Sequence, residues 1–181
     1  MSSNFLKLNA EKTHFAWFGT RQQLLKVNTH SLSNGNASTN IDRVAVDLGV
    51  TLDSELSMQP HFRSCAKTGF YQLRQLWSVR RSLSTDVAKA LAHAFISSRI
   101  DYCNSSFYGA TAKNLCYLQS ILHGAACMVL RRRKFDHISS GTCDELHWLP
   151  VVQRINFKIC LLTYKCLHNM APLYLANLCP G

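Results

Sequence analysis

Apolar residues recur every three or four positions through most of the chain after residue 54, which is the spacing of amphipathic helices. The first stripe predicts a helix whose buried face consists of Phe62, Cys65, Ala66, Phe70, Leu73, Leu76 and Trp77. Ser84 is a suitable N-cap for a second helix, which runs through Tyr102 and stops at Gly109. The predicted buried face of this second helix consists of Val87, Leu91, Ala94, Phe95 and Ser98.

Two further helices are predicted in the remaining part of the chain. One begins near Thr111 and the other at Pro150, which suits a first helical position. The buried face of the third helix consists of Leu115, Leu118, Ile121, Leu122, Ala125, Ala126, Val129 and Leu130. The fourth helix extends to about Asn169 and buries Val151, Ile155, Ile159, Leu162 and Cys166.

Residues 1–53 have a different pattern. The segment His14–Gly19 (HFAWFG) and the segment Val44–Asp53 (VAVDLGVTLD) predict two strands, the second kinked at Gly49. The polar segment Asn28–Asn40 between them predicts a flexible loop, so the two strands would form a hairpin with a long connection. The predicted fold class is α+β, mainly α, with a small β-hairpin followed by a bundle of about four helices.

The charge of the chain changes the range of expected partners. The 20 lysines and arginines outnumber the 10 acids, which favours a polyanionic partner, either nucleic acid or an anionic membrane. A hydrophobic content of 47% excludes a disordered chain. The sequence shows neither a secretory signal nor a stretch of about 18 apolar residues. We therefore expect an intracellular protein, nuclear or cytoplasmic, that is not secreted and does not bind a membrane.

The basic residues that would contact nucleic acid lie mainly at the ends of two predicted helices. They are Arg74, Arg80, Arg81, Arg99, Arg131, Arg132, Arg133 and Lys134. Capping of the negative helix ends is the alternative for any single residue. Four consecutive cations at 131–134 exceed what capping requires and favour contact with phosphates. The interleaved aromatic residues Tyr71 and Trp77 have the spacing of core positions and are not interpreted as base-stacking residues.

No catalytic or metal-binding pattern is present. The only adjacent acidic pair is Asp144 and Glu145, and the sequence has no P-loop, G-x-S-x-G or H-E-x-x-H motif. The eight cysteines have irregular spacings, although Cys160, Cys166 and His168 lie close together in the sequence. We expect reduced cysteines that act as small buried apolar residues, and no metal site. The segment Ser97–Gly109, SSRIDYCNSSFYG, is interpreted as a helix end with Arg99 and Asp101 pointing outward.

Five segments, in this order, resemble the C-terminal part of a non-LTR retrotransposon reverse transcriptase of the jockey and chicken-repeat type. The segments are SSNFLKLNAEKTHFAWFG, VAVDLGVTLDSELSMQPHF, FYQLRQLWSVRRSL, HAFISSRIDYCNSSFYG and ELHWLPVVQRINFKICLLTYKCLHNMAPLYLANL. The resemblance implies that residues 1–53 are a remnant of the polymerase palm with a primer-grip-like hairpin. It also implies that residues 54–181 are the helical thumb and the start of the connector.

The resemblance also implies roles for particular residues. Lys12 corresponds to the late-palm lysine that helps to protonate the leaving pyrophosphate, and Leu48, Gly49 and Val50 correspond to the primer grip. The metal-binding aspartates of the family belong to upstream motifs that this sequence lacks. We therefore expect a polymerase fragment that is inactive alone, with Mg²⁺ needed only by the full-length enzyme.

The expected partner is RNA or an RNA–DNA hybrid. Two alternatives remain open at this stage. In the first alternative, the chain is a helical module that binds protein through a surface that once faced the palm. In the second, it is a gene fragment without a function.

Overall fold

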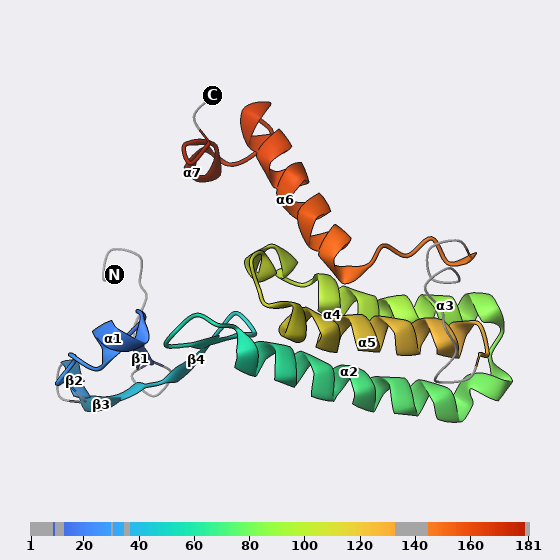
Figure 1. The fold of residues 1–181 in the computed structure, drawn as a ribbon, viewed down its shortest axis with the longest axis horizontal. Coiled ribbons are helices and arrows are strands. Elements are labelled where there is room, and N and C mark those ends of the chain that lie inside the picture. The colour runs from blue at the N-terminus through green and yellow to red at the C-terminus, as the bar shows by residue number, and fades with distance from the viewer. Residues whose placement is uncertain (1–8, 10–12, 30, 35–36, 133–144, 180–181) are drawn as a thin grey trace. The chain divides into compact units, whose positions relative to one another are not determined.

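The computed structural model describes residues 9, 13–29, 31–34, 37–132 and 145–179 (Figure 1). The chain is a mainly helical α+β protein, in which small sheets precede the helices, so the predicted fold class is confirmed. It divides into a first unit, Met1–His61, and a helical unit, Phe62–Gly181. The sequence placed this boundary after residue 53.

The first unit contains a three-stranded sheet beside one short helix. The elements are β1 (Phe15–Ala16), α1 (Arg21–Leu24), β2 (Ser31–Asn34) and β3 (Ala37–Asp42), with strand order β1-β3-β2. Strand β3 pairs parallel to β1 and antiparallel to β2. The prediction of a flexible loop over Asn28–Asn40 is therefore wrong. The segment lacks the apolar alternation that marks a half-buried strand, so its residue pattern offers no signal for the β2–β3 hairpin.

A second hairpin follows directly. Strands β4 (Val44–Asp47) and β5 (Val50–Asp53) are antiparallel, with Val44 opposite Asp53 and Asp47 opposite Val50. Leu48 and Gly49 form the two-residue turn, with positive φ angles of 45° and 84°. Positive φ at both positions is typical of the tight hairpin turn whose twist matches that of the strands. The predicted hairpin between His14–Gly19 and Val44–Asp53 is thus wrong, because Val44–Asp53 pairs with itself.

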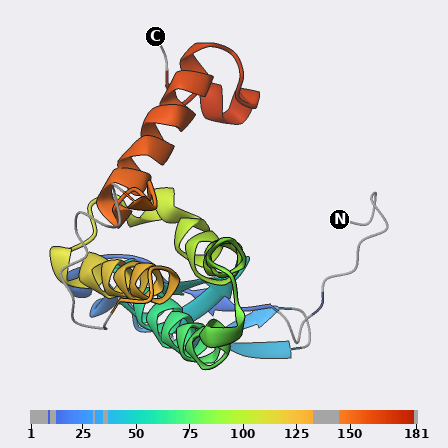
Figure 2. The same ribbon diagram turned by 90° about the vertical axis from the view of Figure 1, so that its right-hand side faces the viewer.

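The helical unit contains long helices together with shorter helical segments (Figures 1 and 2). Its elements are α2 (Gln59–Val79, which begins at the end of the first unit), η3 (Arg80–Ser82), α3 (Thr85–Ala92), η4 (His93–Ser97), α4 (Ser98–Asp101), η5 (Asn104–Phe107), α5 (Ala112–Val129), α6 (Val151–Leu167) and α7 (Leu173–Ala176). The predicted N-cap at Ser84 is confirmed, because its side chain accepts a hydrogen bond from the Val87 amide. Thr111 caps α5 in the same way, through the Asn114 amide.

The core of the helical unit lies between α2, α5 and the segment that links them. The rings of Phe62 and Phe107 pack with their centroids 4.8 Å apart, and both side chains are fully buried. Helices α2 and α5 approach closely. A Cβ atom on Gly124 would lie 2.6 Å from a methyl group of Leu73. Close approach of this kind explains a glycine inside a helix, where it costs about 1 kcal/mol relative to alanine.

The segment between Ser84 and Gly109 differs from the single helix that was predicted. A π-helical turn, η4, interrupts it, and Cys103 then takes a left-handed φ of 52° before the 3₁₀ turn η5. The predicted buried face is also wrong, since Val87, Ala94, Phe95, Ser98 and Tyr102 are exposed. The residues that are buried are Ala88, Ala92, Ile96, Ser97 and Ile100. The covered face thus combines the small Ala88 and Ala92, which allow close helix packing, with the apolar Ile96 and Ile100.

Candidate nucleic-acid interface

The net charge of the protein lies entirely in the helical unit. Phe62–Gly181 contains fifteen of the 20 lysines and arginines and five of the ten acids, a balance of +10, whereas Met1–His61 contains five of each. The described acids of the helical unit are Asp86, Asp101 and Glu145, and two of them are ion-paired with Arg154 and Arg132. Most cations of this unit therefore have no nearby carboxylate to neutralise them among the described residues.

The exposed side of α2 carries a regular row of side chains, which we call the basic–aromatic stripe. Its members are Arg63, Lys67, Phe70, Arg74, Trp77 and Arg81. The intervals between them alternate between four and three residues, so the row follows one side of α2 into η3. Its length is about 27 Å at 1.5 Å per residue. The adjoining side of α2 is buried and contains Phe62, Ala66, Leu73 and Leu76.

The two aromatic members of the stripe correct the sequence analysis. Phe70 and Trp77 were predicted to face the core, but they are 41% and 38% exposed. Each lies between two cations of the stripe, and Tyr71 lies beside them with 57% of its surface exposed. Aromatic faces between cations are typical of surfaces on which bases stack while phosphates are neutralised. Arg63 and Lys67 were not predicted to bind nucleic acid, although the spacing of their charges with Arg74 and Arg81 is visible in the sequence.

Arg80 does not belong to this surface, contrary to its predicted role in nucleic-acid binding. Its side chain is 2% exposed and reaches the C-terminal end of α5. There Nε donates to the Met128 carbonyl, and Nη2 donates to the Val129 carbonyl, each at 2.8 Å; Nη1 donates to the Leu83 carbonyl at 2.7 Å. The last carbonyls of a helix lack internal donors and carry partial negative charge. Arg80 therefore caps α5, which explains why a cation is buried here without a carboxylate.

The burial of Arg80 also affects its titration. Burial, together with a smaller repulsion from Arg131, lowers the pKa of Arg80 from its ordinary value. The guanidinium nevertheless stays charged at neutral pH because arginine is a very strong base. The positive charge at the end of α5 is therefore a permanent part of the fold.

The cationic run at residues 131–134 is only partly described. Arg131 takes a positive φ of 54° and donates from Nη2 to the Leu83 carbonyl at 3.2 Å. Arg132 forms an ion pair with Glu145. Arg133 and Lys134 lie outside the described residues. Arg131 and Arg132 thus both contact protein groups.

Arg99 and Asp101 behave differently from each other. Arg99 is exposed on α4 and lies close enough to α2 that its charge opposes the rise in the pKa of the Cys65 thiol, which burial causes. Asp101, predicted to point outward, accepts a hydrogen bond at 2.8 Å from Arg154 Nη1 of α6. Asp101 therefore joins α4 to α6, and the segment Ser97–Gly109 contains a junction between these helices.

The residues that resemble a primer grip lie at the turn of the β4–β5 hairpin. Leu48 is 83% exposed and Gly49 is also exposed, whereas Val50 is buried. The Thr51 amide donates to His61 Nδ1 at 3.2 Å, which ties β5 to the start of α2. Lys12 lies outside the described residues. The hairpin thus presents a leucine and a glycine backbone at its tip, within the first unit.

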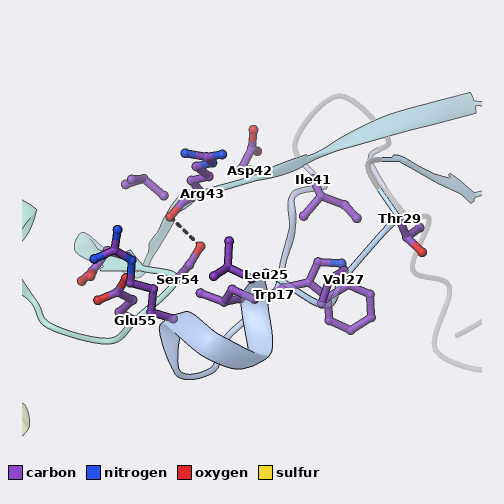
Figure 3. A pocket seen from close by; sticks show the side chains of 13 residues that line it. Trp17, Leu25, Val27, Thr29, Ile41, Asp42, Arg43, Ser54 and Glu55 are labelled. Atoms are coloured by element: carbon purple, nitrogen blue, oxygen red, sulfur yellow. Dashed lines mark hydrogen bonds between the residues drawn. The ribbon is translucent and has the colours of Figure 1, made fainter.

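The first unit also contains a cavity of about 570 Å³ that the sequence did not predict (Figure 3). Its apolar part is formed by Trp17, Leu25, Val27 and Ile41, and its charged rim includes Glu55. Asp53 also lies at the rim, where its carboxylate accepts hydrogen bonds from the Ser57 and Met58 amides. Ser54, which also lines the cavity, donates a hydrogen bond from its hydroxyl group to the Arg43 carbonyl at 3.0 Å.

The described residues contain no group of three or more histidines, cysteines or acids that could hold a metal ion. No helix in the described part of the chain combines the length and the apolar composition that crossing a bilayer requires. The chain matches no protein-family model, no curated protein sequence and no solved structure.

Proposed function

We propose that the helical unit binds RNA or an RNA–DNA hybrid through the basic–aromatic stripe of α2. The observation that carries this proposal is the row of four exposed cations and two exposed aromatic rings on one side of a single helix. None of these cations takes part in an ion pair with a described residue. The cations at 67, 74 and 81 are about 10.5 Å apart along the helix, and the two rings repeat with the same period.

We further propose that the chain corresponds to the late palm, primer grip and thumb of a non-LTR retrotransposon reverse transcriptase. The order of the five resembling segments supports this assignment, and the helical unit would then be the thumb. In this proposal the exposed turn at Leu48 and Gly49 is the primer-grip element. Glycine there suits close approach of a backbone to nucleic acid. The chain has no catalytic aspartates of its own and requires the rest of the polymerase for synthesis.

Binding of a fluorescent RNA–DNA hybrid at several salt concentrations tests the proposal. Contact of four cations with phosphates predicts a log–log salt slope of about −3 to −4. Substitution of Lys67, Arg74 or Arg81 by glutamine should each reduce the magnitude of the slope by about 0.9. Lys113→Gln, at the exposed start of α5, is the matched control and should leave the slope unchanged. Binding that is absent or insensitive to salt contradicts the proposal.

Aromatic stacking is tested separately. Trp77→Ala should weaken binding of single-stranded RNA by about 1–3 kcal/mol, the range for loss of one base-stacking contact. Val79→Ala removes a similarly exposed apolar side chain from the end of the same helix, outside the stripe, and should have little effect. Equal losses in the two variants would show that Trp77 acts only through helix stability. A primer-extension assay with Mg²⁺ and the full chain should show no synthesis.

A second candidate function is supported by the surface of α6 and α7. Phe157, Tyr164, Leu167, Leu173 and Tyr174 are all more than half exposed there. A set of large apolar side chains in one place is typical of protein interaction sites. A helical protein-binding module is therefore the alternative. It is favoured if Phe157→Ser abolishes association with a partner while the hybrid does not bind.

A further inference from the structure

The chain reverses direction after α6, and this reversal brings Cys166 of α6 close to Cys179, which follows α7. The reversal begins at Asn169, which has a positive φ of 56°, and the Met170 amide donates to the Lys165 carbonyl at 2.8 Å. Helix α7 then lies beside the last turns of α6 in both views (Figures 1 and 2). The Cys179 amide donates to the Ala176 carbonyl at 3.0 Å, which continues the turn of α7 up to Cys179.

Cys166 is buried and interacts with Cys179 of the returning segment. Cys166 is 8% exposed, although Tyr164 and Leu167 beside it on α6 are 53% and 54% exposed. The sulfhydryl groups of Cys166 and Cys179 lie within hydrogen-bonding reach of each other. Burial raises the pKa of the Cys166 thiol, and the adjacent Cys179 thiol raises it further. Both cysteines are free in the structure, and Cys179 is the more accessible of the two.

The chemistry available to this pair is limited by what surrounds it. Zinc in proteins usually takes four ligands, and the described residues offer no third histidine, cysteine or acid close to the pair. We propose that Cys166 and Cys179 form a reversible intramolecular disulfide that fastens α7 to α6. The oxidant is a low-molecular-weight disulfide of the glutathione class.

The reaction proceeds in two thiol–disulfide exchanges. The Cys179 thiolate attacks one sulfur of the small disulfide, whose S–S bond breaks and releases one small thiolate. Cys166 then loses its proton and attacks Cys179 Sγ, which expels the second small thiolate. The two protein thiols lose two electrons and two protons in total, and the small disulfide is reduced to two thiols.

Mass spectrometry of the full chain tests this pairing. The protein is equilibrated with mixtures of oxidised and reduced glutathione, alkylated, denatured and cleaved with trypsin. Both cysteines fall in one tryptic peptide, Cys166–Gly181, which contains no other cysteine, lysine or arginine. The expected product is this peptide without alkyl groups and lighter by two hydrogen atoms than its reduced form. Cys160, exposed on the same helix, falls in the peptide Ile159–Lys165 and reports oxidation of an isolated thiol.

Two variants separate pairing from general thiol reactivity. Cys166→Ser should trap Cys179 as a mixed disulfide with glutathione, whereas Cys160→Ser should leave ring closure unchanged. In the oxidised wild-type protein, chymotrypsin should cleave at the exposed Tyr174 more slowly than in the reduced protein, because α7 can no longer separate from α6. The proposal is overturned if Cys166 and Cys179 are both alkylated under conditions that modify Cys160. A stable mixed disulfide at Cys179 in the wild-type chain would overturn it as well.

Discussion

The first unit is held together mainly by backbone hydrogen bonds, whereas the helical unit is held together by a side-chain core. In the described part of Met1–His61, the buried residues are Val50, Met58 and His61. The other buried side chains of the described residues lie in the helical unit, which also has the whole net charge of +10. A charged surface that binds a polyanion needs a rigid support. Of the two units, only the helical unit has both a side-chain core and a net positive charge. The hairpins of the first unit depend more on their surroundings, since two-stranded hairpins are marginal alone.

The strongest test of this comparison removes a core ring from the helical unit. Phe62→Ala deletes a fully buried side chain that packs against Phe107, so we expect the free energy of unfolding to fall by about 3–5 kcal/mol. Urea unfolding followed by circular dichroism measures the loss. Val46→Ala, in an exposed position of β4, is the control from the first unit and should change stability by less than about 0.5 kcal/mol. Similar losses in the two variants would show that both units depend equally on side-chain burial.

The next test compares two adjacent arginines within the helical unit. Arg80→Met removes the guanidinium donors from the Met128 and Val129 carbonyls and should reduce the free energy of unfolding by about 2–4 kcal/mol. Arg81→Met, in an exposed position, should change it by less than about 0.5 kcal/mol. Thermal and urea unfolding of the two variants measure the difference.

The same two variants give the opposite order in a binding assay. Arg81→Met should weaken binding of the RNA–DNA hybrid and reduce its salt dependence, because Arg81 belongs to the basic–aromatic stripe. Arg80→Met, tested at a temperature where it is folded, should retain the salt slope of the wild-type protein. If Arg80→Met instead reduces the salt slope of binding and leaves the free energy of unfolding unchanged, the assignment of Arg80 as the cap of α5 is wrong.

These two arginines also show what the sequence could and could not predict. The N-cap at Ser84, the start of a helix near Thr111 and the mainly α class follow from local patterns, and the structure confirms them. Whether Arg80 or Arg81 is buried depends on where the end of α5 lies, and α5 is nearly 50 residues away along the chain. The ion pair between Asp101 and Arg154 spans 53 residues and is equally invisible in local spacing.

Two other errors have a local cause. The covered face of α3 and α4 contains Ala88 and Ala92, whereas the larger Val87 and Phe95 are exposed. Hydrophobicity favours the large residues, but close helix packing favours the small ones. The β2–β3 hairpin was missed because serine, threonine and asparagine give no apolar alternation. In the basic–aromatic stripe, the regular spacing of the charges was visible, but which side of α2 faces solvent was assigned incorrectly at Phe70 and Trp77.

A smaller effect is expected at the turn of the β4–β5 hairpin in the first unit. Leucine at the positive φ of position 48 is unfavourable by roughly 1 kcal/mol, whereas an asparagine before glycine suits this turn. Leu48→Asn should therefore stabilise the hairpin by about 0.5–1 kcal/mol. Hydrogen exchange of the β4 and β5 amides measures the change. Slower exchange confined to these strands is expected, and faster exchange would contradict the turn geometry.

The least pronounced expected effect is a pH dependence at the junction of β5 with the start of α2. Burial lowers the pKa of His61, so the folded state binds a proton less readily than the unfolded chain. The stability that neutral His61 contributes is present above the unfolded pKa of about 6.5 and is lost as the pH falls from there toward the lowered folded pKa. Protonation also removes the Nδ1 acceptor of the Thr51 amide. Exchange of the Thr51 amide, measured from pH 7.5 to 5, should accelerate beyond the intrinsic effect of pH.

His61→Asn separates this effect from general acid destabilisation, because an asparagine oxygen can accept from the Thr51 amide and does not titrate. The pH dependence of exchange at Thr51 should flatten in this variant. Burial lowers the pKa of His123 in α5 too, and its ring is hydrogen-bonded to Gln119. His123→Asn should therefore flatten the pH dependence of the helical unit and leave that of Thr51 unchanged. If His123→Asn alone abolishes the response at Thr51, the loss of protection in β5 follows unfolding of the helical core, and the two units are not independent in stability.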